Sequence, residues 1–157
     1  VPRDANERAA LRDAMRRLRF GSLRDGVWTR PDNLPRASAP ADSWRIADEQ
    51  CSWWCARPEG DPAGVAAELF DSARWSTRAD ALSERLARST KALSGPDDGS
   101  LADAFGAGAA SLAHIRSDPL LPPELAVDAQ SGAALRRAYR TYEAAFSKAI
   151  RGWFRQR

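Results

Sequence analysis

The chain has 157 residues, a formal net charge of +3 and an isoelectric point of about 9.3. This length allows one domain or two very small ones, and no apolar run reaches the roughly 18 residues that a membrane-spanning helix needs. Two cysteines are too few for a disulfide scaffold. The charged start shows no secretory signal, so we expect a cytoplasmic protein. Because the first residue is Val1 rather than Met, we expect a fragment, a processed chain or the ordered part of a longer protein.

The first predicted element is a helix over residues 6–19. Its apolar residues recur three and four positions apart, which is typical of an amphipathic helix. Asp4 or Asn6 would cap its start, and Gly21 would end it. A turn is expected at 24–26, because this segment ends in Asp-Gly.

Extended patterns follow. A short strand is predicted over 27–30, and the proline-rich segment 31–42 is predicted to be a loop. Residues 44–47 form a possible strand. Residues 50–57 form a better one, since they are bulky and apolar and are followed by a proline. Two or three short strands make only a marginal sheet, so a strand before Val1, or one from another chain, would complete it.

From residue 63 onwards the patterns are helical. A short helix is predicted over 63–70, with Val65, Leu69 and Phe70 turned inward. Three longer helices are then expected, with apolar stripes that include Phe105 in the second; they cover residues 75–93, 101–115 and 132–154. The element order predicts an α+β first half and an all-α second half.

His114 is the one histidine of the chain, which excludes a site built from several histidines. The expected role of a lone histidine near a helix end is a cap or a packed polar side chain, and the functional alternative is to polarise a bound effector. In a strand, Cys51 and Cys55 would have Cα atoms roughly 13 Å apart, too far for a disulfide. We expect them to be unbridged core cysteines on one face, with Trp53 between them.

Trp53 and Trp54 would point to opposite faces of that strand. One is expected in the core, and the other lines an interface or a pocket, unless the sheet is buried on both sides. The arginines of the first and last helices form either solvated faces or a surface for phosphates; they are Arg8, Arg12, Arg16, Arg19, Arg136, Arg137, Arg140, Arg151, Arg155 and Arg157. We find no catalytic motif or acid–base pair, and we predict no enzyme activity, no cofactor and no metal site.

Three segments resemble the PaaX family of bacterial transcriptional regulators. Leu11–Pro31 is similar to the family stretch "LR..L...GFG.L..GVW..P", and Ala67–Asp71 is similar to the short helix that follows a later strand. Asp118–Leu125, with the sequence DPLLPPEL, is close to the family signature "DPLLPPELL". The three segments occur in the family's order and at about its spacing.

The resemblance implies a fold and a function. Proteins of the family consist of a winged-helix DNA-binding domain, a ferredoxin-like domain similar to a small CRISPR-associated endoribonuclease, and a helical domain. They are dimeric repressors of aromatic catabolism that an aryl-CoA thioester such as phenylacetyl-CoA releases from DNA. By this resemblance, residues 1–72 would be the ferredoxin-like domain without its first strand, and 73–157 the helical domain; the winged helix would be absent.

The resemblance also implies an effector site and partners. Candidate effector-binding residues are Trp53, Trp54, Arg57, His114, Arg116 and Arg136, with the arginines receiving CoA phosphates. The expected partners are a second copy of the chain, DNA through the absent winged helix, and an aryl-CoA, with no membrane.

Two alternatives remain open: a ligand-free dimerisation module, and a degenerate metal-dependent nuclease in which Asp4 would stand in for the metal-binding acidic residue. Gln130 stands where the family has tryptophan, which leaves the effector's identity open.

Overall fold

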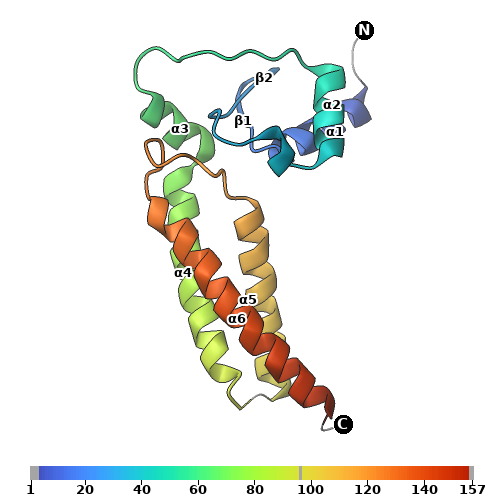
Figure 1. The fold of residues 1–157 in the computed structure, drawn as a ribbon, viewed down its shortest axis with the longest axis vertical. Coiled ribbons are helices and arrows are strands. Elements are labelled where there is room, and N and C mark those ends of the chain that lie inside the picture. The colour runs from blue at the N-terminus through green and yellow to red at the C-terminus, as the bar shows by residue number, and fades with distance from the viewer. Residues whose placement is uncertain (1–3, 96, 156–157) are drawn as a thin grey trace. The chain divides into compact units, whose positions relative to one another are not determined.

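The structure is a computed structural model that describes residues 4–95 and 97–155, without the side chain of Asp98 (Figure 1). The described chain is mostly helical with one small antiparallel sheet, so the α+β class is correct at this level. It divides into two compact units. Unit 1 contains the described residues up to Ser72 together with Pro119–Ala126, and unit 2 contains Ala73–Asp118 and the described residues from Val127 onwards. The segment 119–126 therefore clusters with the first unit, although it lies within the predicted second domain.

Unit 1 begins with helix α1 (Ala5–Arg17), as the sequence predicts. Asp4 is the N-cap: its carboxylate accepts a hydrogen bond from the backbone N–H of Glu7 at 2.7 Å, and the Glu7 side chain accepts one from the Asp4 N–H at 3.0 Å. This reciprocal capping box satisfies two N–H groups that an uncapped helix start leaves unpaired. Leu11 and Met15 turn inward from the helix, one turn apart.

A β-hairpin follows α1. Strand β1 (Gly21–Arg24) pairs antiparallel with β2 (Val27–Thr29), with Ser22 opposite Trp28. The predicted turn lies between them, and Gly26 adopts a positive φ of 75°, a conformation that costs glycine little. The prediction for β2 is confirmed, whereas β1 was not predicted.

Helix α2 (Ala41–Gln50) replaces the strand predicted over 44–47, which is wrong. Trp44 and Ala47 are buried one turn apart and pack with Leu11 and Met15 of α1. Helical spacing puts these two residues on one face, whereas a strand would put them on opposite faces. The core of unit 1 therefore lies between α1 and α2.

The strand predicted over 50–57 is also wrong. Gln50 ends α2, and residues 51–58 run without ladder pairing to any described residue; Figure 1 shows this stretch as the long connection from α2 to α3. Helix α3 (Pro62–Phe70) then confirms the short predicted helix. Its buried residue is Ala66, while Val65, predicted inward, is 41% exposed.

Unit 2 consists of three long helices that match the three predicted ones: α4 (Ser72–Ala92), α5 (Asp98–Arg116) and α6 (Ala129–Arg155). Each contributes to one core, and α6 crosses α4 and α5 in Figure 1. The core residues include Leu82 and Leu86 from α4, Ala104 from α5 and Leu135 from α6. Phe105, placed on the apolar stripe of α5, is 65% exposed, so it lies outside this core.

Candidate functional site

Arginine and aromatic side chains gather in unit 1 around Trp44. Phe20, at the end of α1, and Trp53, in the segment after α2, each lie with their ring centroids within 6.2 Å of the Trp44 ring. Arg36 stacks its guanidinium 4.0 Å from the Trp44 ring centroid, and Arg30 lies 5.5 Å from it. Cation–π contacts of this kind attract a positive charge to the ring face. We call Phe20, Arg30, Arg36, Trp44, Asp48 and Trp53 the arginine–tryptophan cluster.

Asp48, on α2, joins two members of the cluster by hydrogen bonds. Its carboxylate accepts a hydrogen bond from Arg36 at 2.5 Å and another from the indole N–H of Trp53 at 2.7 Å. The hydrogen bond from Arg36 lowers the pKa of Asp48, and the Trp53 bond adds to this. The Trp44 indole N–H donates to the backbone carbonyl of Arg36 at 2.9 Å. Asp48 therefore holds the Arg36 guanidinium beside the Trp44 ring, and the indole N–H of Trp44 holds the Arg36 backbone.

Arg30 has a more structural position. Its guanidinium donates to the carbonyls of Leu18 and Leu34 at 3.2 and 2.9 Å, which joins the end of α1 to the loop after β2. Burial lowers its pKa, the nearby charge of Arg36 acts in the same direction, and Asp32 opposes both. This arginine holds the loop rather than facing an open space.

An open groove of about 690 Å³ lies beside the cluster. Its lining carries two positive and two negative side chains and the edge of one indole; the lining residues are Arg36, Ala37, Ala39, Ala41, Trp44, Arg45, Asp48 and Glu49. Arg45 pairs with Glu49 at 3.0 Å, one turn further along α2, and both side chains are more than half exposed. The lining thus combines three alanines, one indole and charged side chains, a mixture typical of ligand-binding grooves.

A second polar cluster lies in unit 2, where α4 and α5 meet the start of α6. The rings of Trp75 and His114 stack with their centroids 4.6 Å apart, and His114 Nε2 lies 2.9 Å from the Trp75 carbonyl oxygen. The carbonyl can only accept, so that nitrogen carries the proton. The Trp75 indole N–H in turn donates to the Ser117 hydroxyl at 3.3 Å. His114 is thus the packed polar histidine that the sequence favours.

Asp118 and Arg136 complete this histidine cluster. Arg136, on α6, donates to the carboxylate of Asp118, which is 7% exposed and follows the end of α5. The Gly132 backbone lies beside this ion pair. A Cβ placed there would lie 3.2 Å from the Asp118 carboxylate and 3.3 Å from the Trp75 ring. The close packing shows that the ion pair anchors the chain as it leaves α5.

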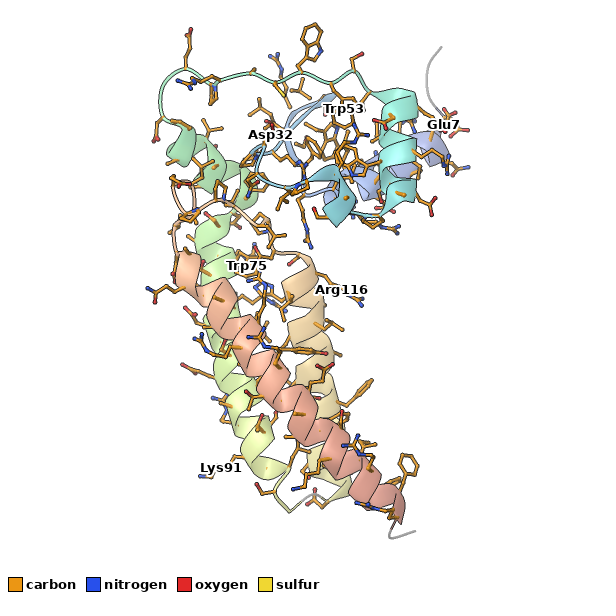
Figure 2. All side chains as sticks on the ribbon, viewed as in Figure 1. Glu7, Asp32, Trp53, Trp75, Lys91 and Arg116 are labelled. Atoms are coloured by element: carbon orange, nitrogen blue, oxygen red, sulfur yellow. The ribbon has the colours of Figure 1, made fainter. Side chains whose placement is uncertain are left out.

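The structure distributes the six predicted effector residues over the two units. Trp53 belongs to the arginine–tryptophan cluster, whereas Trp54 is 88% exposed and Arg57 is exposed in the same segment. His114 and Arg136 belong to the histidine cluster, and Arg116 extends away from α5 in Figure 2.

The two cysteines have different environments. Neither is in a disulfide, as expected, and Cys51 packs against the core of unit 1. Cys55 is exposed, so the prediction that it is a core cysteine is wrong. Within residues 4–95 and 97–155, no group of three or more His, Cys, Asp and Glu side chains lies close enough together to hold a metal ion. No helix of this described part is both long and apolar enough to cross a membrane.

Sequence reasoning missed Arg30, Arg36, Trp44 and Asp48 as site residues. The signal that could have found them is the four-residue spacing of Trp44 and Asp48, which puts both on one face once 41–50 is a helix. A proline just before Ala41 and an aspartate in the first turn mark the start of that helix.

Comparison with known proteins gives one informative match. No protein-family model matches the chain, and no curated protein matches it. Among solved structures, it is similar to the uncharacterized protein Rv0674 from Mycobacterium tuberculosis, with a TM-score of 0.72 and 36% sequence identity. The match covers 95% of this chain and 57% of that one, so the chain spans little more than half the length of that protein.

Proposed function

We propose that this chain is the effector-binding and dimerisation portion of a PaaX-like transcriptional repressor of aromatic catabolism. The observation that carries the proposal is the order of elements in unit 1: α1, β1, β2, α2 and the extended segment 51–58. A ferredoxin-like domain has the order β-α-β-β-α-β. Unit 1 has the same order as a ferredoxin-like domain that lacks its first strand, if residues 51–58 correspond to the last strand.

The extended segment supports this interpretation. In the ferredoxin-like topology the last strand pairs with the first strand of the domain, so without that first strand it has no neighbour. Residues 52–58 form no strand ladder with any described residue, and Cys51, just before them, has strand-like dihedral angles. A segment of this kind, outside any ladder, favours a further strand beside it. In the order of the chain, the helical unit 2 corresponds to the family's C-terminal domain.

The proposed effector site is the groove beside the arginine–tryptophan cluster. The aryl group of an aryl-CoA packs on the alanine-lined floor and the edge of Trp44, while a phosphate replaces Glu49 as the partner of Arg45. Trp53 stays in its contacts with Trp44 and Asp48 and supports the wall of the groove. His114 and Arg136 are not part of this proposed site, because both are already bonded within unit 2.

Release from DNA then follows from differential affinity. The effector binds one dimer geometry better than the other and shifts the population away from the DNA-competent one. DNA is bound by a winged-helix domain elsewhere in the full protein, and this portion supplies the dimer contact and the ligand response.

Isothermal titration calorimetry of the chain with phenylacetyl-CoA tests the proposal. We expect binding by the unchanged chain and a loss of about 10- to 100-fold in affinity for Arg45→Ala, because one charge-assisted bond to phosphate contributes about 1.5–3 kcal/mol. Arg12→Ala, an exposed arginine of α1, is the matched control and leaves the affinity unchanged. Absence of binding at saturating ligand would rule out this effector.

A ligand-free dimerisation module is the second candidate function. It is favoured by two aromatic side chains that unit 2 leaves exposed, Phe105 at 65% and Phe154 at 67%. Large exposed apolar side chains are typical of interfaces between proteins. Sedimentation analysis separates the two candidates, since a tight dimer that no acyl-CoA alters would favour this module.

A further inference from the structure

The outer face of α6 carries a continuous line of positive charge. We call it the basic stripe, and it consists of Arg137, Arg140, Lys148, Arg151 and Arg155. All five side chains are exposed. They occur at intervals of three, eight, three and four residues, which keeps them on one side of a helix that turns every 3.6 residues. Ion pairs within the described residues do not include any of the five.

The stripe lies directly opposite the buried face of the same helix. Leu135, Tyr142 and Ala149 point into the core of unit 2, half a helical turn away from the stripe. The positions along the stripe that are not basic hold small side chains, Ala133 and Ala144, and both are exposed. Small residues let a rod-shaped partner approach the helix backbone while the long basic side chains reach around it.

The segregation of charge distinguishes α6 from the other arginine-rich helices. In α1, Arg16 pairs with Asp13, and in α4, Arg88 pairs with Glu84. In α6, Glu143 is the one acidic residue among the 27 of the helix, and it lies to the side of the stripe. A face with a single sign of charge focuses a positive potential, whereas alternating signs cancel within a few ångströms.

We infer that the basic stripe binds the phosphate backbone of double-stranded DNA without reading its sequence. The 19 residues from Arg137 to Arg155 are separated by 18 rises of about 1.5 Å and span about 27 Å of helix, which is the length of roughly eight base pairs of duplex. The phosphates of each strand wind around the duplex, so a straight stripe of this length meets phosphates of both strands where it crosses a groove. Arginine and lysine side chains that extend from one helix face toward a duplex bind phosphates by charge, and phosphate contacts carry no sequence information.

A membrane surface fits the stripe less well than DNA. Helices that bind a bilayer surface insert an apolar face next to their basic residues. The apolar face of α6 is instead occupied by the core of unit 2. This inference does not depend on the proposed repressor function or on the groove of unit 1.

Fluorescence anisotropy of a labelled DNA duplex of random sequence, titrated with the whole chain over a range of salt concentrations, tests the inference. Five phosphate contacts predict a slope of about −4.5 for log K against log salt concentration, at about −0.9 per contact. The triple variant Lys148→Ala, Arg151→Ala and Arg155→Ala reduces the slope by about 2.7, which lowers affinity on the order of 10²-fold at 0.1 M salt.

The control variant removes three exposed arginines from unit 1 by Arg12→Ala, Arg17→Ala and Arg24→Ala. It lowers the net charge by the same amount and keeps the slope of the unchanged chain. Equal losses in the two triple variants would mean that net charge alone drives binding, and would overturn the inference. It would also be overturned if the unchanged chain did not bind DNA at low salt, or bound vesicles containing phosphatidylserine more tightly than DNA. Circular dichroism of each variant shows that its helices are retained.

Discussion

Two glycines of α5, separated by one residue, are expected to respond oppositely to the same substitution. A Cβ built at Gly108 would lie 2.5 Å from the hydroxyl oxygen and 2.6 Å from Cε1 of Tyr142, whereas at Gly106 the nearest side-chain atom would be an Arg85 guanidinium nitrogen at 3.7 Å. Tyr142 cannot easily move, since it is 4% exposed and its hydroxyl donates to the Ala104 carbonyl at 2.7 Å. The position of Gly108 therefore sets how closely α5 and α6 approach.

The magnitudes follow from two opposing effects. Replacing glycine by alanine inside a helix stabilises by about 0.5–1 kcal/mol, which is the whole effect expected for Gly106→Ala. At Gly108 an overpacked core adds a cost of about 1–3 kcal/mol, so Gly108→Ala is expected to destabilise by about 1 kcal/mol. Urea denaturation followed by circular dichroism measures the difference of about 2 kcal/mol between the variants, with an unchanged slope in denaturant. If Gly108→Ala were as stable as Gly106→Ala, the close approach would be refuted.

Three further predictions concern unit 2. Arg136→Met removes the partner of the buried Asp118 carboxylate and is expected to lower the free energy of unfolding by about 1–3 kcal/mol, measured by urea denaturation at neutral pH. Hydrogen bonds from Ser100 lower the pKa of Asp97, so the unchanged chain loses stability as the pH falls from about 4; Asp97→Asn keeps the cap and loses this dependence in acid thermal melts. Burial raises the pKa of Tyr142 to about 12, so stability present below pH 10 is lost as the pH rises through 12, and alkaline denaturation of Tyr142→Phe lacks that loss.

The helices that sequence analysis predicts correctly are those whose burial follows a long periodic pattern. In α1, Leu11 and Met15 are buried at the helical spacing that the sequence displays, and Asp4 caps the start as expected. In α6, Leu135 and Tyr142 are two turns apart and both buried. A pattern repeated over several turns excludes a strand, because a strand would turn alternate members to the other face.

The strand predicted over 44–47 fails for the opposite reason. Four residues are too few to separate a helix from a strand by periodicity, so the bulk of Trp44 decided the prediction. The tertiary partner of Trp44 is α1, which buries Trp44 and Ala47 together. Residues 51–58 have the composition of a strand, but a strand also needs a neighbour with which to pair, and this is not a property of the segment itself.

The arginine–tryptophan cluster depends on that misassigned helix. Trp44 and Asp48 would be roughly 13 Å apart in a strand, whereas one helical turn makes them neighbours on a face. Arg36 and Trp53 reach that face from before and after α2. Asp118 follows the end of α5, and its partner Arg136 lies on α6, 18 residues later. A contact over this separation depends on how the two helices pack, so a local sequence pattern does not predict it.

The basic net charge of the chain comes from two kinds of arginine, which the structure distinguishes by their neighbours. An isoelectric point of about 9.3 is compatible with an anionic partner and equally with solvated helix faces. In α1 the acidic residues lie between the arginines, and Arg16 bonds to Asp13, so this helix has the alternating signs of a solvated face. In α6 the arginines are segregated from acidic residues: Arg136 pairs with Asp118, and the five remaining basic residues lie on the outer face, with Glu143 to its side as the one acidic residue of the helix. Because salt weakens binding in proportion to the number of phosphates neutralised, the slope of affinity against salt distinguishes these two kinds of arginine. Removal of three charges from α6 should change that slope, whereas removal of three from unit 1 should not.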